Sequence, residues 1–530
     1  MNLKRHRLFI MFTIICALTG GKAGAQSTSV FTTGLKAPAK MVLTGRGNLL
    51  VAESGAGANT GRLSLVDRKT GVRRTILDGL PAGANLEGGT SGPSGLALRG
   101  DTLFMTIGQG DAVLRGPAPG SEMTNPNPSS PIFSSVLSIT ASSGVEASTE
   151  AFRALNSGDH SNLKGGGQVI LINASGDMLT IRLVADFPDS IPNPRPDFPD
   201  NVRVSNPFGV AVSGGVLYVV DASHNLVKTV GAESGSTTTL ATFAPIPRPT
   251  PAPPPGGPVV EAVPDSVRLF GDQLLITFLT GFPFPQGLAE VRKVDIVSGS
   301  QLSFITGLTA AIDVQPVKVL NGQEFFTLEF STNMLAQPSA APGRLSLYET
   351  PTAAPVIIAA PLISPTSVAR DRSTGDIFIT SIFTGQVLRV DAARLLVRRH
   401  YRDFLLREPD AEGWNFWQGQ ITQCGDNAQC RDNKSVDVSR AFYYSAEFIA
   451  AHPELAENLH GTAEYNRAFV KQAYFTYLQR TCDPEICDAE GFNFWVNKIN
   501  GRLPSLDGDY NEMIRAFLRS TEYRARLGLS

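Results

Sequence analysis

Charged residues, histidines and long apolar runs are scarce in this chain. Only 18% of the residues are charged and the formal net charge is -2, so we expect no nucleic acid or anionic membrane surface as a partner. The Gly-x-Ser-x-Gly and His-Glu-x-x-His motifs are absent, and the six His residues leave little for a His-rich metal site. The chain therefore lacks the common hydrolase signatures, and its sequence identifies no catalytic residue.

The first 25 residues have the pattern of an export signal. Lys4, Arg5 and Arg7 precede an apolar run over residues 8–18, and a small-residue cleavage site ends at Ala25. That run is about 11 residues long, short of the roughly 20 that cross a bilayer, and no later segment is longer. We therefore predict cleavage near Ala25 and a secreted or periplasmic mature protein without a transmembrane anchor.

Four of the five cysteines follow the signal and form two close pairs in polar loops, Cys424 with Cys430 and Cys482 with Cys487. In an oxidising compartment such pairs are most simply disulfides, Cys424–Cys430 and Cys482–Cys487, although four cysteines allow three connectivities. A zinc site is an alternative, but its cysteines usually lie two to four residues apart with His nearby. Free thiols are the remaining alternative.

One β pattern recurs through residues 26–391, in which a Pro precedes an apolar strand, a Gly-containing turn and a second apolar strand. Short strands at this spacing indicate a repeat array, and a closed ring protects their edges. We therefore predict an all-β six-bladed β-propeller; a β-sandwich is the alternative. The six predicted starts are Pro38, Pro93, Pro207, Pro264, Pro316 and Pro365.

The ends of this region predict how the ring closes. Residues 30–35 resemble the outer strand of the first blade but precede that blade, while the last blade, ending at Asp391, has no outer strand. We expect the N-terminal strand to complete the last blade. Two insertions are also predicted: residues 115–164, with a strand and a short helix near residues 151–155, and the Pro-rich residues 245–258, with an extended polyproline-like course.

Two phrases in this region carry a family resemblance. Ser205-Asn206-Pro207-Phe208-Gly209-Val210 and Leu279-Thr280-Gly281-Phe282-Pro283-Phe284-Pro285 resemble the ScyD/ScyE family of exported bacterial propellers. The resemblance covers about residues 30–391 and implies an NHL-like propeller without an established activity.

A different repeat fills residues 392–530. Asp-Ala-Glu-Gly-Trp-Asn-Phe-Trp (410–417) returns as Asp-Ala-Glu-Gly-Phe-Asn-Phe-Trp (488–495), and apolar residues at helical spacing precede both phrases. We predict a C-terminal all-α domain made of two repeated helical modules, with Asp410 and Asp488 as helix N-caps. Residues 395–527 resemble a helical domain of unknown function found in bacterial exported and surface proteins, which implies a structural or interaction role.

Candidate ligand-binding residues lie at the ends of the predicted inner strands. Asn206, Asp221 and Asp265 are candidate metal ligands, because Ca²⁺ prefers carboxylate and amide oxygens. Six-bladed calcium-dependent lactonases use such residues, and a bound cation would polarise a lactone carbonyl. The resemblance is partial, since Asn206 precedes Pro207 whereas the Asn of that family follows Pro, and no matching Glu is evident. Asp and Asn also serve strand-end turns.

The sequence as a whole favours an exported, non-enzymatic binding or scaffold propeller with a helical interaction module. Its partner would be an unknown protein or glycan at the cell exterior, and no cofactor is required. The alternative is a calcium-dependent, lactonase-like hydrolase that acts in the propeller channel.

Overall fold

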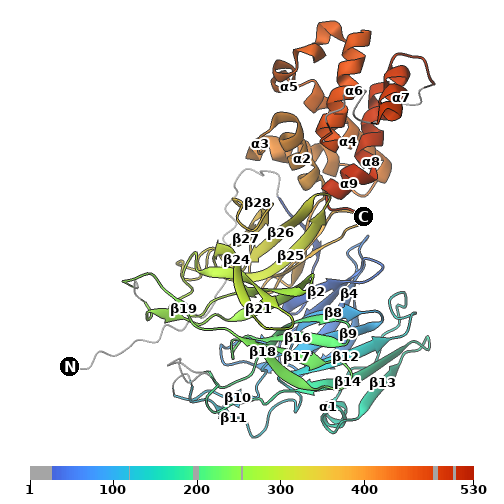
Figure 1. The fold of residues 1–530 in the computed structure, drawn as a ribbon. Helices are drawn as coiled ribbons and strands as arrows, with labels where there is room; N and C mark the ends of the chain where they lie inside the picture. The colour runs from blue at the N-terminus through green and yellow to red at the C-terminus, as the bar shows by residue number, and fades with distance from the viewer. Residues whose placement is uncertain (1–26, 118–119, 195–201, 252–254, 481–487, 505–508) are drawn as a thin grey trace.

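The computed structural model describes residues 27–530 except 118–119, 195–201, 252–254, 481–487 and 505–508. The predicted export signal therefore lies outside the described residues. Strands occupy most of the chain up to Val390 and helices follow from Ala393, and Figure 1 shows these C-terminal helices packed together at one side of the β region. In the part of the chain that the structure describes, every helix is too short or too polar to span a bilayer.

The β region is a six-bladed propeller, as predicted. Each blade is an antiparallel sheet, and each innermost strand contacts the innermost strands of the blades on either side, so the ring is closed. The strands from the inside outward are β2 (Pro38–Leu43), β3 (Leu49–Glu53), β4 (Gly61–Val66) and β5 (Arg73–Leu80) in blade 1; β8 (Pro93–Arg99), β9 (Thr102–Ile107), β12 (Ser135–Ala141), β14 (Met178–Asp186) and β13 (Gln168–Ile172) in blade 2; β15 (Pro207–Ser213), β16 (Val216–Asp221), β17 (Leu226–Gly231) and β18 (Thr237–Thr242) in blade 3; β21 (Pro264–Phe270), β22 (Gln273–Phe278), β23 (Ala289–Asp295) and β24 (Gln301–Leu308) in blade 4; β25 (Ala311–Val319), β26 (Gly322–Glu329), β27 (Gly343–Tyr348) and β28 (Val356–Leu362) in blade 5; and β29 (Pro365–Arg370), β30 (Ile377–Ser381), β31 (Gln386–Val390) and β1 (Ser29–Thr32) in blade 6.

Position in a blade explains the residue pattern of each strand. Blades stack face to face, so a second strand is buried on both sides and carries a continuous apolar run, as in Leu274-Leu275-Ile276 of β22. An outermost strand has one solvent face and alternates, as β13 does.

The first strand of the chain closes the ring, as predicted. Strand β1 pairs with β31 of the last blade, with Val30 opposite Leu388. The Phe31 ring packs against Phe378 with centroids 4.9 Å apart, and the Leu35 amide donates to the Gly385 carbonyl at 3.0 Å. The two ends of the β region are therefore held together inside one sheet.

Three local predictions were wrong. Pro316 lies inside β25, which begins at Ala311, and Ala310 has the positive φ (+47°) that also precedes β2, β21 and β29. The strand predicted within residues 115–164 is present as β12, but it is the third strand of blade 2 rather than part of an insertion. The helix of that region is α1 (Ser157–Lys164), which begins after the predicted range because Asn156 caps it through the Gly158 and Asp159 amides.

The long loops between strands carry three short hairpins. The Pro-rich segment lies within one of them, because Ile246 and Pro247 near its start pair with Val259 and Val260 just after its end. The hairpins are β6 (Gly83–Ala84) with β7 (Thr90–Ser91), β10 (Val113–Leu114) with β11 (Met123–Thr124), and β19 (Ile246–Pro247) with β20 (Val259–Val260).

The helical region has two halves with matching elements. The first half holds α2 (Ala393–Leu405), α3 (Ala411–Thr422), α4 (Ala428–Tyr443) and α5 (Ala446–Ala451), and the second half holds α6 (Ala463–Leu478), α7 (Ala489–Ile499), α8 (Asp509–Arg519) and α9 (Thr521–Arg526). Two short 3₁₀ turns, Pro453–Leu455 and Glu457–Leu459, connect them.

The same contacts recur in both halves. Asp410 and Asp488 cap α3 and α7 by accepting the Gly413 and Gly491 amides at 2.8 and 3.0 Å, which confirms their predicted role. Neither Gly leaves room for a side chain, because a Cβ on Gly413 would lie 2.1 Å from the Tyr401 hydroxyl and one on Gly491 would lie 2.7 Å from that of Tyr474. Each repeated phrase therefore begins a helix and lets it approach the preceding one.

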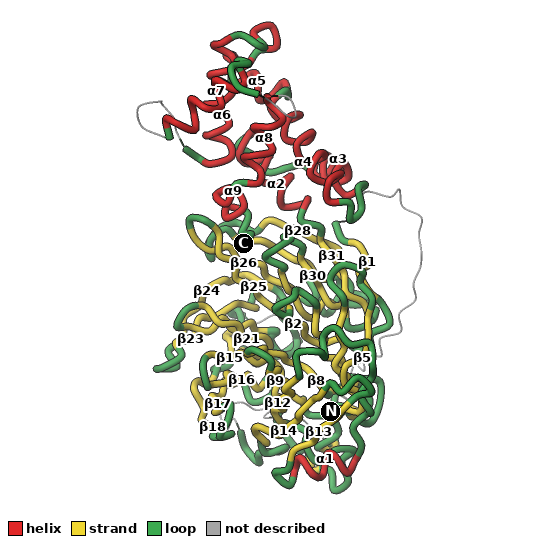
Figure 2. Tube along the Cα trace, turned by 90° about the vertical axis from the view of Figure 1, so that its right-hand side faces the viewer, coloured by secondary structure: helices red, strands yellow, loops and turns green. Residues whose placement is uncertain are grey.

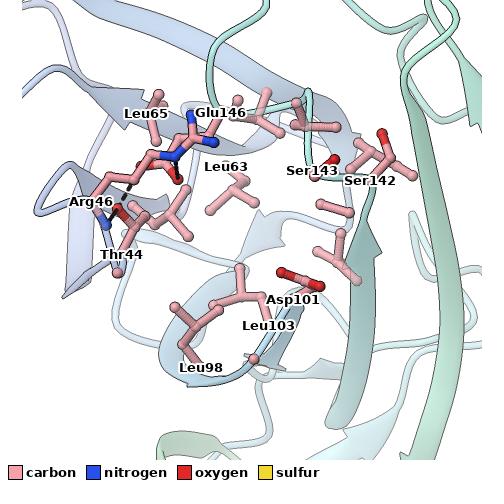
Figure 3. A pocket seen from close by; sticks show the side chains of 18 residues that line it. Thr44, Arg46, Leu63, Leu65, Leu98, Asp101, Leu103, Ser142, Ser143 and Glu146 are labelled. Atoms are coloured by element: carbon pink, nitrogen blue, oxygen red, sulfur yellow. Dashed lines mark hydrogen bonds and ion pairs between the residues drawn. The ribbon is translucent and has the colours of Figure 1, made fainter.

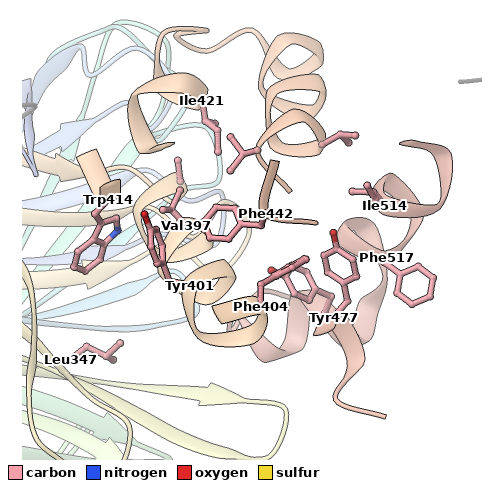
Figure 4. Packing of buried hydrophobic residues seen from close by; sticks show 14 of the residues in the cluster. Leu347, Val397, Tyr401, Phe404, Trp414, Ile421, Phe442, Tyr477, Ile514 and Phe517 are labelled. Carbon is pink, nitrogen blue, oxygen red and sulfur yellow. The ribbon is translucent and has the colours of Figure 1, made fainter. Parts of the chain in front are cut away.

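Aromatic side chains fill the core of the helical region (Figure 4). Tyr401 packs edge-on against Phe442 in the first half and Tyr474 packs edge-on against Phe517 in the second, both with centroids 5.0 Å apart. The predicted disulfide Cys424–Cys430 is present and is typical of proteins outside the cytoplasm. The second predicted pair, Cys482–Cys487, lies outside the described residues.

The helical region packs directly on blades 5 and 6. One apolar cluster joins Leu347 and Val390 of these blades to Val397 and Trp414 of the helices. At the C-terminus, the Leu320 amide donates to the Ala525 carbonyl at 2.9 Å and the Ser530 amide to the Arg372 carbonyl at 3.0 Å. Both views place the C-terminus at this junction (Figures 1 and 2).

Ring closure predicts a specific effect of Phe31→Ala. The ring of Phe31 fills the space between β1 and Phe378, so we expect its removal to lower the free energy of unfolding by about 2 kcal/mol. Val30→Ala in the same strand is the matched control; its side chain is 54% exposed, and a change within about 0.5 kcal/mol is expected. Equal effects of both substitutions in chemical denaturation would contradict the role assigned to β1.

Candidate functional site

Lys40 of β2 fills the centre of the propeller. Its side chain is buried, and its ammonium group donates to the Asp265 carboxylate at 2.7 Å, the Ile312 carbonyl at 2.7 Å and the Thr366 carbonyl at 2.9 Å. The same nitrogen lies 5.3 Å from the centre of the Phe208 ring, within the range of a cation–π contact. One side chain of blade 1 thus contacts blades 3, 4, 5 and 6, and all three of its protons are used.

Asp313 of β25 is the second charged centre of the channel. Arg268 binds its carboxylate through two nitrogens, at 2.6 and 3.1 Å. Burial raises the pKa of Asp313, but the Arg268 guanidinium and the Lys40 ammonium outweigh burial and hold this pKa at about 2. The remaining donors to this carboxylate come from blades 4, 5 and 6; they are Ser266 Oγ, Ser367 Oγ and the amides of Val314 and Val368.

Little open space remains between these groups. The cavity lined by Lys40, Gly95, Gly209 and Ser266 measures about 10 Å³, which is room for one water molecule at most. The glycines matter here, because a Cβ on Gly95 would lie 2.4 Å from the Phe208 carbonyl oxygen and one on Gly209 would lie 2.6 Å from that of Asp265. The space among these residues is therefore too small for an organic substrate.

The three candidate metal ligands all have protein partners. Asp265 binds the Lys40 ammonium, and burial, opposed by Lys40, raises the pKa of Asp265 to about 6. Asp221 accepts from Ser205 Oγ at 2.6 Å and the Asn206 amide at 3.0 Å. Asn206 Oδ1 lies 3.3 Å from the Gln109 amide. Their oxygens thus face protein donors rather than one shared point, which fits a calcium site poorly.

His224 is the charged partner of Asp221. Its Nδ1 lies 3.1 Å from Asp221 Oδ2 and its Nε2 lies 3.1 Å from the Arg203 carbonyl oxygen. Burial opposes the charge on both groups, but their mutual attraction lowers the pKa of Asp221 and raises that of His224. This buried pair holds the loop before β15 against the end of β16. Within the described residues, no group of three or more His, Cys, Asp or Glu side chains is arranged to hold a metal ion.

Glu53 has the same structural role in blade 1 that Glu329 has in blade 5. Each ends the second strand of its blade, is fully buried, and pairs with an Arg on the third strand, Arg62 or Arg344. Each also accepts a backbone amide from the loop before the first strand. A sequence signal for this pair existed, since both third strands carry Gly-Arg-Leu-Ser-Leu, at residues 61–65 and 343–347.

A larger hollow lies between blades 1 and 2 and was not predicted. Its volume is about 350 Å³, and leucine and isoleucine side chains from both blades form the apolar part of its wall (Figure 3). Arg46 and Glu146 lie on one side of its mouth and Asp101 on the other. Such a space forms only where two blades meet, so local sequence patterns do not reveal it.

The helical region exposes one aromatic side chain of each repeated phrase. Phe416 and Phe494 are 56% and 46% exposed, and each packs edge-on against the Trp that follows it, Trp417 or Trp495, at 4.8 and 5.1 Å. By contrast, Trp414 and Phe492 are buried. The first aromatic residue of each phrase is therefore part of the core, and the second is not.

Comparison with known proteins assigns neither a family nor a function to this chain. No protein-family model and no curated protein matches the chain. Among solved structures, a chain of a nidogen/laminin complex is 10% identical with a TM-score of 0.35, over 65% of this chain and 89% of that one. An auxiliary nutrient binding protein from Bacteroides thetaiotaomicron is 10% identical with a TM-score of 0.39, over 67% and 69% of the two chains.

A putative glucose dehydrogenase from Thermus thermophilus is 14% identical with a TM-score of 0.34, over 68% of this chain and 98% of that one. At these scores the likenesses carry no argument about activity or ligand. The strands and helices themselves define the class, which is a six-bladed β-propeller protein with a docked C-terminal helical region.

The Lys40–Asp265 pair predicts a pH-dependent effect of Lys40→Met. Removing the ammonium leaves the Asp265 carboxylate buried without a counter-charge, so we expect a loss of about 3–5 kcal/mol in the free energy of unfolding at pH 8. Even with Lys40 present, burial raises the folded-state pKa of Asp265 to about 6, above the ordinary value of 3.8, and removing Lys40 raises this pKa further. The carboxyl group is therefore mostly protonated at pH 5, and the loss should be smaller there.

The double variant Lys40→Met/Asp265→Leu is the control for this prediction. It removes both charges and should recover much of the stability at pH 8. Denaturant unfolding that gives the same loss for Lys40→Met at pH 5 and pH 8 would show that Asp265 is not its charged partner.

Proposed function

We propose that this protein is an exported, non-enzymatic binding scaffold. The propeller is the rigid base, and the helical region is the part that contacts a protein or glycan at the cell exterior. The observation that carries this proposal is the filled channel, because the position where propeller enzymes hold a substrate is taken by the Lys40 ammonium and its three partners.

Export is supported by the cysteine chemistry and by the N-terminal sequence. The Cys424–Cys430 disulfide forms stably only in an oxidising compartment, and residues 1–25 have the order of charges, apolar run and small residues of a cleaved signal. The resemblance of residues 30–391 to the ScyD/ScyE family, and of residues 395–527 to a helical domain of exported proteins, agrees with this location.

The exposed aromatic pair is the proposed contact surface of the helical region. Phe416 and Phe494 occupy equivalent positions on α3 and α7, and large aromatic side chains half exposed to solvent are typical of binding surfaces. The docking of the helices on blades 5 and 6 fixes these side chains relative to the propeller. A partner would therefore meet two aromatic contacts held at a constant separation.

The proposal predicts that calcium has no effect on stability. The carboxylates of Asp221 and Asp265 already have protein partners, so 5 mM CaCl₂ should leave the midpoint of thermal unfolding unchanged, and lactones should not be hydrolysed. A rise in the midpoint that Asn206→Ala or Asp221→Ala abolishes would instead support the lactonase-like alternative. Mg²⁺ at the same concentration controls for ionic strength.

The proposal also predicts that Phe416→Ser/Phe494→Ser reduces binding to isolated bacterial cell envelopes. Both side chains are exposed, so the variant should fold with an unchanged unfolding midpoint while co-sedimentation with envelopes falls several-fold. Phe475→Ser is the matched control, because Phe475 is 39% exposed on α6 outside the repeated phrases and should leave binding unchanged.

Envelopes treated with protease distinguish the two partner classes. Binding that survives treatment indicates a glycan, and binding that is lost indicates a protein. Equal sedimentation of the double variant and the wild type would contradict the assignment of the aromatic pair.

A further inference from the structure

The hollow between blades 1 and 2 has the size and lining of a small-molecule site. Its volume of about 350 Å³ is more than twice that of the ~150 Å³ apolar cavity that binds benzene, and it lies at the lower end of the range for ligand pockets. Leu63, Leu65 and Ile76 of blade 1 and Leu103, Ile139 and Leu179 of blade 2 form its apolar wall. These strands are held in regular sheets, so the wall exists before a ligand binds.

Junctions between neighbouring blades are not all open in this way. At the equivalent junction between blades 4 and 5, Phe270, Phe304 and Phe325 pack against one another with ring centroids 5.0–5.8 Å apart. No aromatic side chain lines the hollow between blades 1 and 2. The difference in side-chain volume leaves this junction open where the other is filled.

The charges at the mouth favour a cation. On one side, Glu146 is satisfied by the protein, since its carboxylate accepts from Thr44 Oγ1 at 2.5 Å and Asn48 Nδ2 at 2.8 Å and lies 3.8 Å from Arg46 Nε. On the other side, the Asp101 carboxylate has no hydrogen-bond or ion-pair partner among the described residues and lies away from Arg46 and Glu146 (Figure 3). Asp101 is thus the unneutralised charge of the mouth.

The nearest charges outside the lining do not change this balance. The Arg74 guanidinium donates to the carbonyl oxygens of Val145 and Glu146 behind the wall. Arg74 is also attracted by Glu146 and by Asp177, and the Asp177 carboxylate lies within 3.5 Å of Ser142 Oγ and Asn173 Nδ2. The positive and negative groups behind the wall offset each other, which leaves the mouth negative.

We propose that this hollow binds an amphiphilic amine, with an aliphatic chain against the leucine and isoleucine wall and an ammonium group beside Asp101. Burial of the chain provides the affinity, and the carboxylate selects a cation over an anion of the same length. This site is independent of the channel and of the helical contact surface.

Titration calorimetry with three eight-carbon probes tests the proposal on the full chain. We expect octylammonium to bind saturably and about tenfold or more tightly than octanoate, with 1-octanol between them. Asp101→Asn should bring the affinities for octylammonium and octanoate within about twofold of each other and leave that for 1-octanol unchanged. Ala141→Leu, which extends a side chain into the hollow, should weaken all three.

The chain offers a matched control in blade 4. Gly271-Asp272 occupies the turn that Gly100-Asp101 occupies in blade 2, and both turns lie between the first and second strands. Asp272→Asn should therefore leave binding unchanged, because Asp272 does not line the hollow. Absence of saturable binding by all three probes, equal affinity for octylammonium and octanoate, or a preference that survives Asp101→Asn would each overturn the proposal.

Discussion

The burial of Lys40 at the centre of the ring is the interaction on which the rest of the propeller depends. An ammonium group removed from water is strongly destabilising unless all of its protons find acceptors. Here the acceptors come from three different blades, Asp265, Ile312 and Thr366, and a fourth blade contributes the Phe208 ring. The blades must hold their positions around the axis for these bonds to form, so one side chain couples the geometry of the whole ring.

Strand β1 at the outer edge and the Lys40 hydrogen bonds at the centre both hold the ring closed. Strand β1 gives blade 6 its outer strand and holds the first residues of the β region beside the last, while Lys40 on the next strand reaches across the channel. The helical region then packs on blades 5 and 6, and the C-terminal residues add backbone hydrogen bonds to the turns of both blades. The β blades and the repeated helices thus pack into one continuous structure.

The sequence predicted the architecture because its signals are local and repeated. A Pro marks the start of most inner strands, and the phrases at 410–417 and 488–495 mark two equivalent helices. The prediction failed at Pro316 because blade 5 begins with Ala311, where the positive φ of the preceding residue persists without a Pro. Turn geometry, not residue type, is what the blades share at this point.

The functional regions were less predictable, because they depend on contacts between distant segments. Lys40 lies in Pro38-Ala39-Lys40-Met41, where one Lys in a short strand is usually solvent-facing; nothing nearby indicates that residues about 225 to 326 positions away bind it. Asp265 was predicted as a candidate metal ligand at the end of an inner strand, and nothing in the local sequence indicates that its carboxylate binds the Lys40 ammonium. The hollow beside Asp101 likewise exists only between two blades.

The most direct test of this account is a high-resolution crystal structure of the protein grown with calcium. The account predicts that Lys40 Nζ lies within hydrogen-bonding distance of Asp265, Ile312 O and Thr366 O, and that no calcium ion occupies the channel. A Lys40 side chain turned out of the channel, with a calcium ion bound to Asp265 in its place, would contradict it.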